Sequence, residues 1–341
     1  MSGNSVFEHR HSGVLSIAAI EAPVVVTSDW IDEQLAETYE RTGVRPGLLA
    51  GIAGITERRW WDEGVTFADA AAQAGRLAIE RAGIDPSRIG ILMSTSVCKD
   101  HLEPSIACNV HHQLGLSTSC MNFDIANACL GFTNAMHVAS TMIDAGTIEY
   151  ALIVDGEGSR YTQQTTIERL QRSDATADDV FAEFASLTLG SGAAAMVIGR
   201  TDRHPEAHRI VGGVARAATQ HHELCVGTLD RMTTDTKGLL VAGLDLAADT
   251  WDNVPEGFGW KSGIDWYILH QVSQVHTSLL CDRLGIDPAQ APLTLQRYGN
   301  VGPAAMPITL ASVQDRVRSG DRVLCMGIGS GLNVSMTEIV W

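Results

Sequence analysis

Short runs of apolar and β-branched residues alternate along the chain with longer stretches of mixed polarity. The short runs predict buried strands at residues 90–96, 150–155, 194–198, 209–214, 266–269, 322–326 and 333–341. The stretches between them predict helices at residues 69–82 and 130–145 and in a polar segment at 165–179. Strands that alternate with amphipathic helices predict an α/β fold.

The two parts of the chain carry their predicted elements in a similar order. We therefore expect two βαβαβ-like halves, residues 1–205 and 206–341. No segment rich in Pro, Gly or Ser separates them, so the halves should pack as one body. Two segments rich in charges and turns, 160–190 and 217–262, are expected to be insertions or surface caps.

The composition narrows the classes of function. The 341 residues carry a net charge of −16, which disfavours nucleic-acid binding because phosphate contacts need a basic surface. No apolar run reaches the roughly 18 residues of a membrane-spanning helix. Residues 1–26 lack the basic start of a signal peptide. The seven cysteines show no metal-type spacing, so we expect a cytoplasmic enzyme with reduced thiols and no metal.

Cys129 is the first candidate for chemistry. A strand-like run ends near Ala126 and a helix-like run begins near Leu130, so Cys129 should lie at the N-terminus of a helix. Backbone N–H groups and the helix dipole at such a position favour a thiolate. The small neighbours Ala128 and Gly131 leave room for a substrate. The alternative is an inert cysteine, because cysteine is among the most frequently buried residues.

His270 and Asn300 are candidate partners for such a thiolate. His270 directly follows the apolar run 265–269, and the carboxyl end of a buried strand is where α/β sheets place ligand-facing residues. Asn300 lies in a glycine-flanked loop before a helix-like run. Taken alone, Asn300 is more simply interpreted as a turn asparagine.

A glycine-rich turn follows the strand predicted at 322–326. The spacing of Gly327, Gly329 and Gly331 differs from the dinucleotide fingerprint G-x-G-x-x-G, and no helix follows before residue 341. We interpret the segment as a turn whose backbone N–H groups can face a substrate oxygen. A plain strand–turn–strand hairpin is the alternative.

Taken together, these features resemble the thiolase-fold condensing enzymes of the ketoacyl synthase III branch. The order Cys129, His270, Asn300 and a final glycine-rich turn is similar to that family's Cys–His–Asn set. The resemblance implies a thiolase fold, with both halves in one layered αβαβα body. Gly327 stands where two-cysteine thiolases carry a second cysteine, which argues against that class. Within the branch, four stretches look like OleA-type acyl-CoA condensing enzymes, at 54–62, 96–105, 127–132 and 189–194.

The resemblance also implies a covalent mechanism. Cys129 would attack an acyl thioester, with its own N–H and that of Gly331 stabilising the oxyanion. His270 and Asn300 would donate hydrogen bonds to the enolate of a second thioester. In OleA-like enzymes a glutamate in the Leu-Glu-Pro segment reaches into the partner subunit's site. Glu103 matches it, so the resemblance implies Glu103 as the base that removes the α-proton across a homodimer interface.

The implied reaction is a non-decarboxylative Claisen condensation of two fatty acyl-CoAs. Its 2-alkyl-3-ketoacyl product would leave as a β-keto acid. CoA is the substrate carrier, and no cofactor is implied. Because the chain is acidic, the CoA phosphates need local cations, and Arg58, Arg59 and Lys261 are the candidates for the mouth of the tunnel.

Three other functions stay open at this point. The chain could be a decarboxylating 3-oxoacyl-ACP synthase III that uses a malonyl extender, or one subunit of a heterodimeric condensing enzyme. It could also be an acyltransferase that forms no carbon–carbon bond. The presence of all four residues Cys129, His270, Asn300 and Glu103 favours the condensing enzyme. Acyl-chain length, delivery by CoA or carrier protein, and conversion to olefin, ketone or β-lactone are open.

Overall fold

The computed structural model describes residues 3–341 and is built around one long mixed sheet. Its strand order is β12-β13-β14-β9-β2-β8-β7-β5-β6, and β1 pairs with β9. All seven strands predicted from the sequence are confirmed, with ends shifted by a few residues. The strands of this sheet are β1 (Ser5–Glu8), β2 (Ser12–Glu21), β5 (Ile89–Ser94), β6 (Met121–Asp124), β7 (Tyr150–Glu157), β8 (Gly192–Arg200), β9 (His208–Ala217), β12 (Trp266–Leu269), β13 (Arg322–Gly329) and β14 (Asn333–Val340).

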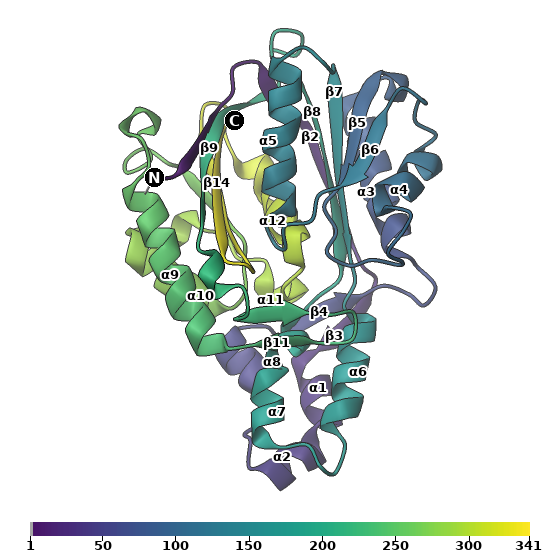
Figure 1. Cartoon of the computed structure of the whole chain (residues 1–341), viewed down its shortest axis with the longest axis vertical. Helices are drawn as coiled ribbons and strands as arrows, with labels where there is room; N and C mark the ends of the chain where they lie inside the picture. Colours follow the sequence, from purple (N-terminus) through teal and green to yellow (C-terminus); the bar gives the residue numbers. More distant parts are fainter. Residues whose placement is uncertain (1–2) are drawn as a thin grey trace.

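Helices lie on both faces of the sheet and between its two arms (Figure 1). In the middle, α5 contacts β7 and β8 on one side and β9 and β14 on the other, and α12 contacts β2, β8 and β12. Outside, α3 covers β2, β7 and β8, and α9 covers β9 and β14. This is the layered αβαβα arrangement predicted from the family resemblance. The helices are α3 (Phe67–Ala82), α4 (Ile106–Leu114), α5 (Gly131–Asp144), α9 (Thr236–Asp252), α10 (Gln274–Leu284) and α12 (Ala305–Val313).

The two arms of the sheet come from different parts of the chain. Strands β2, β8, β7, β5 and β6 lie within residues 12–200, and β9, β12, β13 and β14 lie within residues 208–340. The arms meet where Gly13 and Val14 pair with Arg209 and His208. The turn from β8 to β9 includes the boundary expected near residue 205. The division into units 1–205 and 206–341 stays a prediction.

The buried strands have the composition that this position requires. Every residue of β7 is buried, and β8 is almost entirely Gly, Ala and other apolar residues. Strands covered on both faces are typically continuous apolar runs. By contrast, β7 ends in the buried carboxylates Asp155 and Glu157. Polar side chains inside a core need hydrogen-bond partners. Asp155 and Glu157 must therefore be hydrogen-bonded where they lie at the end of the strand.

The segments expected to be insertions have two different structures. Residues 160–190 form three helices in the lobe at the bottom of Figure 1, beside the two-stranded β3–β4 sheet. Residues 217–262 form a hairpin followed by α9. The surface-cap interpretation is wrong for α9, because Leu246, Ala247 and Trp251 are buried against the sheet. The elements are α6 (Arg160–Leu170), α7 (Ala177–Ala182), α8 (Phe184–Thr188), β3 (Val24–Thr27), β4 (Glu57–Trp60), α1 (Ser28–Gln34), α2 (Ala36–Thr42), β10 (Cys225–Gly227), β11 (Met232–Thr234) and α11 (Leu295–Tyr298).

Hydropathy adds one finding about the helices. Within residues 3–341, none has the length and apolar character needed to cross a membrane.

Candidate active site

Cys129 lies in a tight turn between β6 and α5. The residue before it, Ala128, has a φ of +44°, a left-handed conformation that non-glycine residues rarely adopt. Hydrogen bonds from Leu130 N to Asn127 O (2.9 Å) and from Gly131 N to Ala128 O (3.3 Å) hold the turn. Backbone strain of this kind costs roughly 1–3 kcal/mol and is concentrated at functional sites. The predicted position of Cys129 at a helix N-terminus is confirmed.

The end of β13 packs directly against this turn. A Cβ placed on Gly329 would lie 3.1 Å from Leu130 Cγ and 3.5 Å from Cys129 N. A Cβ on Gly327 would lie 2.7 Å from Leu130 Cδ2 and 3.6 Å from His270 Cβ. The two glycines therefore let β13 approach the nucleophile turn closely, with His270 on the neighbouring strand end.

His270 follows the last residue of β12 and is buried. Its N–H donates to Met326 O at 2.8 Å. Neither ring nitrogen has a hydrogen-bond partner among residues 3–341. Burial, reinforced by nearby His276, lowers the pKa of His270 to about 4. The imidazole is therefore neutral at pH 7, with one nitrogen able to donate and the other able to accept.

Cys129 is half-buried, and its thiol lies beside negative charge. Burial raises the pKa of Cys129 to about 12, with further contributions from Cys225, Glu157 and Asp155. This shift favours a neutral thiol, whereas the helix N-terminus favours the predicted thiolate. A sulfur that rests as a thiol has to lose its proton as it attacks.

Asn300 is held by its loop with its amide nitrogen available. Its side-chain oxygen accepts a hydrogen bond from Gly302 N (3.0 Å), and its backbone N–H donates to Thr188 O (2.9 Å). Gly190 N in turn donates to Asn300 O (2.9 Å). Gly190 has to be glycine, because a Cβ there would lie 1.7 Å from Tyr298 O. Asn300 Nδ2 has no partner among the described residues and can donate to a substrate.

Two buried carboxylates at the end of β7 were not found from the sequence. Glu157 accepts hydrogen bonds from Val97 N (2.6 Å) and Cys98 N (3.3 Å), and Asp155 accepts from Thr95 Oγ1. Burial raises the pKa of Glu157 to about 7 and raises that of Asp155 as well. The available signal was a pair of acids at the carboxyl end of an apolar run, the same signal that identified His270.

Glu103 is not brought to Cys129 within this chain. It lies in the exposed loop between β5 and α4, next to Leu102, which is 97% exposed. Among residues 3–341 its carboxylate forms no hydrogen bond or ion pair. The role of Glu103 as a base across a homodimer interface stays a prediction.

Gly331 lies in the turn between β13 and β14, with a φ of +139° that favours glycine. The turn is linked to the nucleophile turn through amides: Asn333 Nδ2 donates to Asn127 Oδ1 (3.4 Å), and Asn127 Nδ2 donates to Asn134 Oδ1 (2.6 Å). Sequence reasoning missed this chain of asparagines, which connects β14 to α5.

Two of the three side chains predicted to bind the CoA phosphates are buried. Arg58 is fully buried and donates to Val26 O and Leu187 O (3.5 and 3.3 Å). Arg59 is also buried and is engaged by Glu21 and Glu57. Their expected position at a tunnel mouth is wrong, because both side chains are used inside the protein. Lys261 is exposed, 3.8 Å from Asp252, and stays a candidate.

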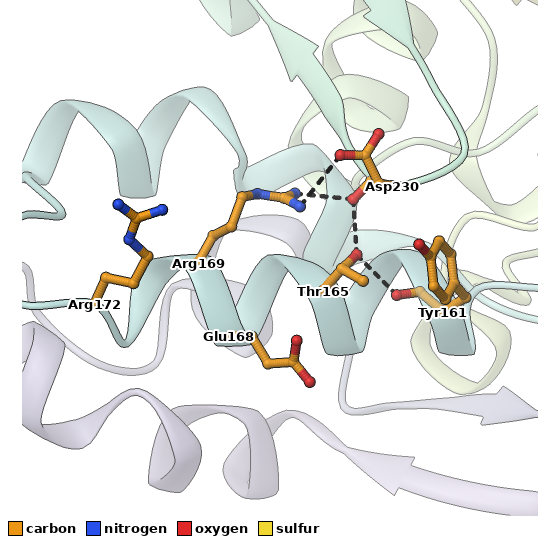
Figure 2. Close-up of a pocket in the computed structure, with 6 residues that line it drawn as sticks. All are labelled: Tyr161, Thr165, Glu168, Arg169, Arg172 and Asp230. Atoms are coloured by element: carbon orange, nitrogen blue, oxygen red, sulfur yellow. Dashed lines mark hydrogen bonds and ion pairs between the residues drawn. The ribbon is translucent and has the colours of Figure 1, made fainter.

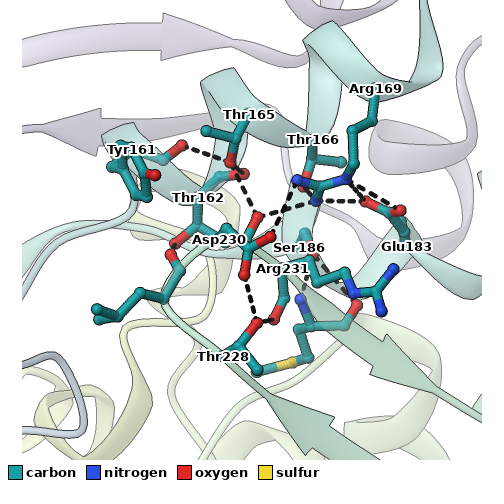
Figure 3. A network of polar contacts seen from close by, with 12 residues as sticks. Tyr161, Thr162, Thr165, Thr166, Arg169, Glu183, Ser186, Thr228, Asp230 and Arg231 are labelled. Carbon is teal, nitrogen blue, oxygen red and sulfur yellow. Dashed lines mark hydrogen bonds and ion pairs between the residues drawn. The ribbon is translucent and has the colours of Figure 1, made fainter. Parts of the chain in front are cut away.

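The β10–β11 hairpin approaches Cys129 at one residue. Cys225 in β10 is close enough to raise the pKa of Cys129. The hairpin is tied to α6 and α8, since Arg169 donates to Asp230 O (2.8 Å) and Met232 N donates to Ser186 Oγ (2.8 Å) (Figure 3). An open hollow beside this network contains none of the predicted site residues (Figure 2); its lining is Tyr161, Thr165, Glu168, Arg169, Arg172 and Asp230.

A second, more enclosed cavity lies beside His270. Apart from His270 and His276, its lining consists of glycine and apolar residues: Ala247, Leu280, Met326, Gly327, Ile328, Val334 and Met336. Its free volume is about 10 Å³, room for about one water molecule, so an acyl chain does not fit in the cavity as it stands. No group of three or more His, Cys, Asp or Glu side chains suited to a metal ion occurs within residues 3–341.

Comparisons with known proteins agree with this geometry. The family model of 3-oxoacyl-[acyl-carrier-protein] synthase III matches residues 123–217, and the model of its C-terminal part matches residues 260–341. These matches and the layered fold define the class, a thiolase-fold condensing enzyme of the synthase III type.

Individual relatives show which family within this class the chain resembles. An acyl-CoA:acyl-CoA alkyltransferase of Xanthomonas campestris pv. campestris is 46% identical, over 97% of this chain and 99% of the relative. One from Shewanella oneidensis is 35% identical, over 96% and 97%. A structure of Xanthomonas campestris OleA with bound lauric acid and lauroyl-CoA superimposes with a TM-score of 0.96 at 45% identity, covering 97% and 99% of the two chains. The chain belongs to the OleA family of acyl-CoA:acyl-CoA alkyltransferases.

Proposed function

We propose that this protein condenses two fatty acyl-CoAs by a non-decarboxylative Claisen reaction, giving a 2-alkyl-3-ketoacyl product. The observation that carries the proposal is the convergence of the Cys129 turn, His270 and the glycine-rich end of β13. Identity of 46% with an acyl-CoA:acyl-CoA alkyltransferase supports this reaction over one that uses a malonyl extender.

The first half-reaction acylates Cys129. The sulfur attacks the thioester carbonyl as neutral His270 accepts the thiol proton, and the CoA sulfur leaves with a proton. The backbone N–H groups of Cys129 and Gly331 stabilise the tetrahedral oxyanion. The products are acyl-Cys129 and free CoA.

The second half-reaction forms the carbon–carbon bond. A base takes the α-proton of a second acyl-CoA, and the enolate oxygen accepts hydrogen bonds from His270 and Asn300 Nδ2. The α-carbon attacks the acyl carbonyl, the carbon–sulfur bond breaks, and the Cys129 thiolate takes back a proton. Hydrolysis of the remaining thioester releases the β-keto acid.

Glu103 of the partner subunit is the proposed base, acting in a homodimer. Its exposed loop is joined to β6, whose last residue Asp124 accepts a hydrogen bond from Ala107 N (2.9 Å) at the start of α4. β6 is the open edge of the sheet, and Met121 on it is 51% exposed. Exposed strand edges with apolar side chains favour pairing with a second chain. An exposed glutamate on such a face is available to the neighbouring subunit.

The compartment proposed for this reaction is the cytoplasm. All seven cysteines lie within residues 3–341 and are free thiols, as expected under reducing conditions.

The test is incubation of the purified protein with myristoyl-CoA and no malonyl donor. CoA release and condensed product are followed together, the product by mass spectrometry. Condensed product that disappears in Cys129→Ala and in Glu103→Ala supports the proposal. Acyl-Cys129 without condensed product in the unsubstituted protein would contradict it and favour a malonyl extender, a second subunit or a simple acyltransferase.

Matched controls keep the test specific. Cys281→Ala removes a buried thiol that lies in the α9–α10 core cluster. Glu80→Ala removes an exposed glutamate on α3. Both variants are expected to retain condensation.

A further inference from the structure

The loop that carries Glu103 is bound to the protein body near both ends and exposed at its tip. It spans residues 97–105, and residues 101–104 are all exposed. A freely moving loop would have to be ordered at each turnover, which costs roughly 1–2 kcal/mol for each residue fixed. A loop held at its ends presents its tip in a defined place before substrate arrives.

Glu157 holds the first end of this loop. Its two carboxylate oxygens accept hydrogen bonds from two successive backbone N–H groups, Val97 (2.6 Å) and Cys98 (3.3 Å). Only 5% of Glu157 is exposed, so water competes little for these bonds. The Cys98 thiol adds a bond to Gly158 O (3.3 Å), next to Glu157 in the chain.

Two other carboxylates hold the rest of the loop. Asp100 accepts from Phe67 N (3.2 Å) at the start of α3. Asp124 pairs with Lys99 and accepts from Ala107 N (2.9 Å). The contacts on both sides of residues 101–104 therefore fix the direction in which the tip leaves the body.

Glu157 differs from Asp100 and Asp124 because it also adjoins the active site of its own subunit. A Cβ on Gly302 would lie 3.5 Å from Glu157 Cδ, and Gly302 N donates to Asn300 Oδ1 (3.0 Å). The charge of Glu157 also contributes to the raised pKa of Cys129. One buried carboxylate thus contacts both the Glu103 loop and the Asn300 loop.

We propose that Glu157 is a positioning residue that sets the place of Glu103 by holding the first two backbone N–H groups of the 97–105 loop. This rests on the proposed function, in which Glu103 removes the α-proton in the partner's site. Glu157 itself touches no reacting atom. Its contribution is to the second half-reaction, and acylation of Cys129 does not need it.

The test separates the two half-reactions in Glu157→Gln. The substitution keeps the shape but exchanges one oxygen for NH2, so one of the two backbone N–H groups loses its acceptor. Condensation of myristoyl-CoA is expected to fall by about tenfold to a hundredfold, the range expected for a misplaced reacting group. The burst of CoA release that reports acylation of Cys129 is expected to stay intact.

A double variant distinguishes positioning from general damage. Glu103→Asp keeps a displaced carboxylate and therefore a measurable rate of condensation; if Glu157 acts through Glu103, adding Glu157→Gln to Glu103→Asp causes less than a multiplicative loss. Losses that multiply, or normal condensation in Glu157→Gln alone, would overturn the positioning role while leaving the base in place. Condensation that survives Glu103→Ala would instead overturn the proposed base, and the positioning role with it.

Two further variants guard against a folding defect. Glu338→Gln alters another buried carboxylate, which is bonded to Trp260 Nε1 (2.6 Å) and Arg322 Nε (2.8 Å) and has no bond to the loop. It is expected to leave the ratio of condensation to acylation unchanged. Glu157→Asp keeps both acceptor oxygens on a shorter side chain. If Glu157→Gln does not fold, the selective loss of condensation is expected in this variant, and equal loss of both half-reactions would overturn the proposal.

Discussion

At the scale of single residues, burial decides the protonation of the reacting groups. Cys129 has a pKa raised to about 12, and His270 has a pKa lowered to about 4, in both cases chiefly through burial. Both shifts favour a neutral thiol and a neutral imidazole over a thiolate–imidazolium pair. In a neutral pair, charge develops only as the sulfur attacks.

The neutral thiol leads to a pH prediction. Only the thiolate reacts with iodoacetamide, so the alkylation rate of Cys129 should rise about tenfold per pH unit from pH 6 to pH 10. Peptide mass spectrometry separates Cys129 from the exposed Cys108. A rate that levels off below pH 9 would mean that the thiolate is far more stable than its burial predicts.

Candidate residues that directly follow apolar runs could be predicted from the sequence. The positions of residues whose contacts come from distant segments of the chain could not. Cys129 and His270 were predicted as candidates because each adjoins a strand or helix end, and the family resemblance added Asn300; their catalytic roles stay predictions. Arg58 was misplaced because a charged side chain is normally exposed, and its partners Val26 O and Leu187 O come from distant segments. Local patterns carry no information on such long-range pairing, and the same holds for the contact of Glu157 with the 97–105 loop.

At the scale of elements, glycines allow the close packing of β13 that forms one side of the candidate active site. The carboxyl end of β13 fits against the Cys129 turn because Gly327 and Gly329 have no side chains. Seven of the ten strands of the main sheet could be predicted, since buried strands are continuous apolar runs. The approach of β13 to α5 could not, because it depends on how two distant segments pack.

Gly327→Ala tests that packing. The new methyl group would lie 2.7 Å from Leu130 Cδ2, so we expect a loss of stability of about 1–3 kcal/mol and slower acylation of Cys129. Chemical denaturation and the CoA-release burst measure the two effects. Gly257→Ala is the matched control, since no atom lies within 4 Å of its added Cβ. Equal behaviour of both variants would contradict the packing argument.

Several hydrogen bonds tie the β10–β11 hairpin to α6 and α8, and those of Arg169 are charge-assisted. Arg169 bridges Glu183 (2.7 Å) and Asp230 O (2.8 Å), so Arg169→Ala leaves the buried Glu183 carboxylate without its cation (Figure 3). We expect a loss of roughly 1–3 kcal/mol and faster hydrogen exchange in residues 225–234. Arg172→Ala, in an exposed pair with Asp174, should change neither quantity. Unchanged exchange in Arg169→Ala would show that other contacts hold the hairpin.

At the scale of the whole molecule, the two end strands of the sheet differ in the exposure of their side chains. β12 ends the sheet with buried Tyr267, Ile268 and Leu269, whereas β6 at the other end is exposed or partly exposed along its length. The Glu103 loop is attached at the open edge. Assembly and catalysis are therefore expected to depend on the same face.

Met121→Lys tests this dependence. A charge on the open edge disfavours strand pairing between subunits, so sedimentation should show a shift toward monomer. Condensation should fall in parallel, while acylation of Cys129 persists in the monomer. Val25→Lys, at another exposed apolar position, should stay dimeric and active. A monomeric Met121→Lys that condenses normally would exclude a base from a second subunit.

The attachment of the Glu103 loop has a consequence for protein engineering. Its anchoring contacts fall on residues 97–100 and 106–107, so the four residues 101–104 form a cassette between fixed ends. Sequences of equal length exchanged at this cassette should leave the host fold undisturbed. Replacing residues 101–104 with the equivalent residues of related enzymes should change the group that generates the carbon nucleophile. The acyl chains that the enzyme accepts should stay the same, because the rest of the protein is unaltered.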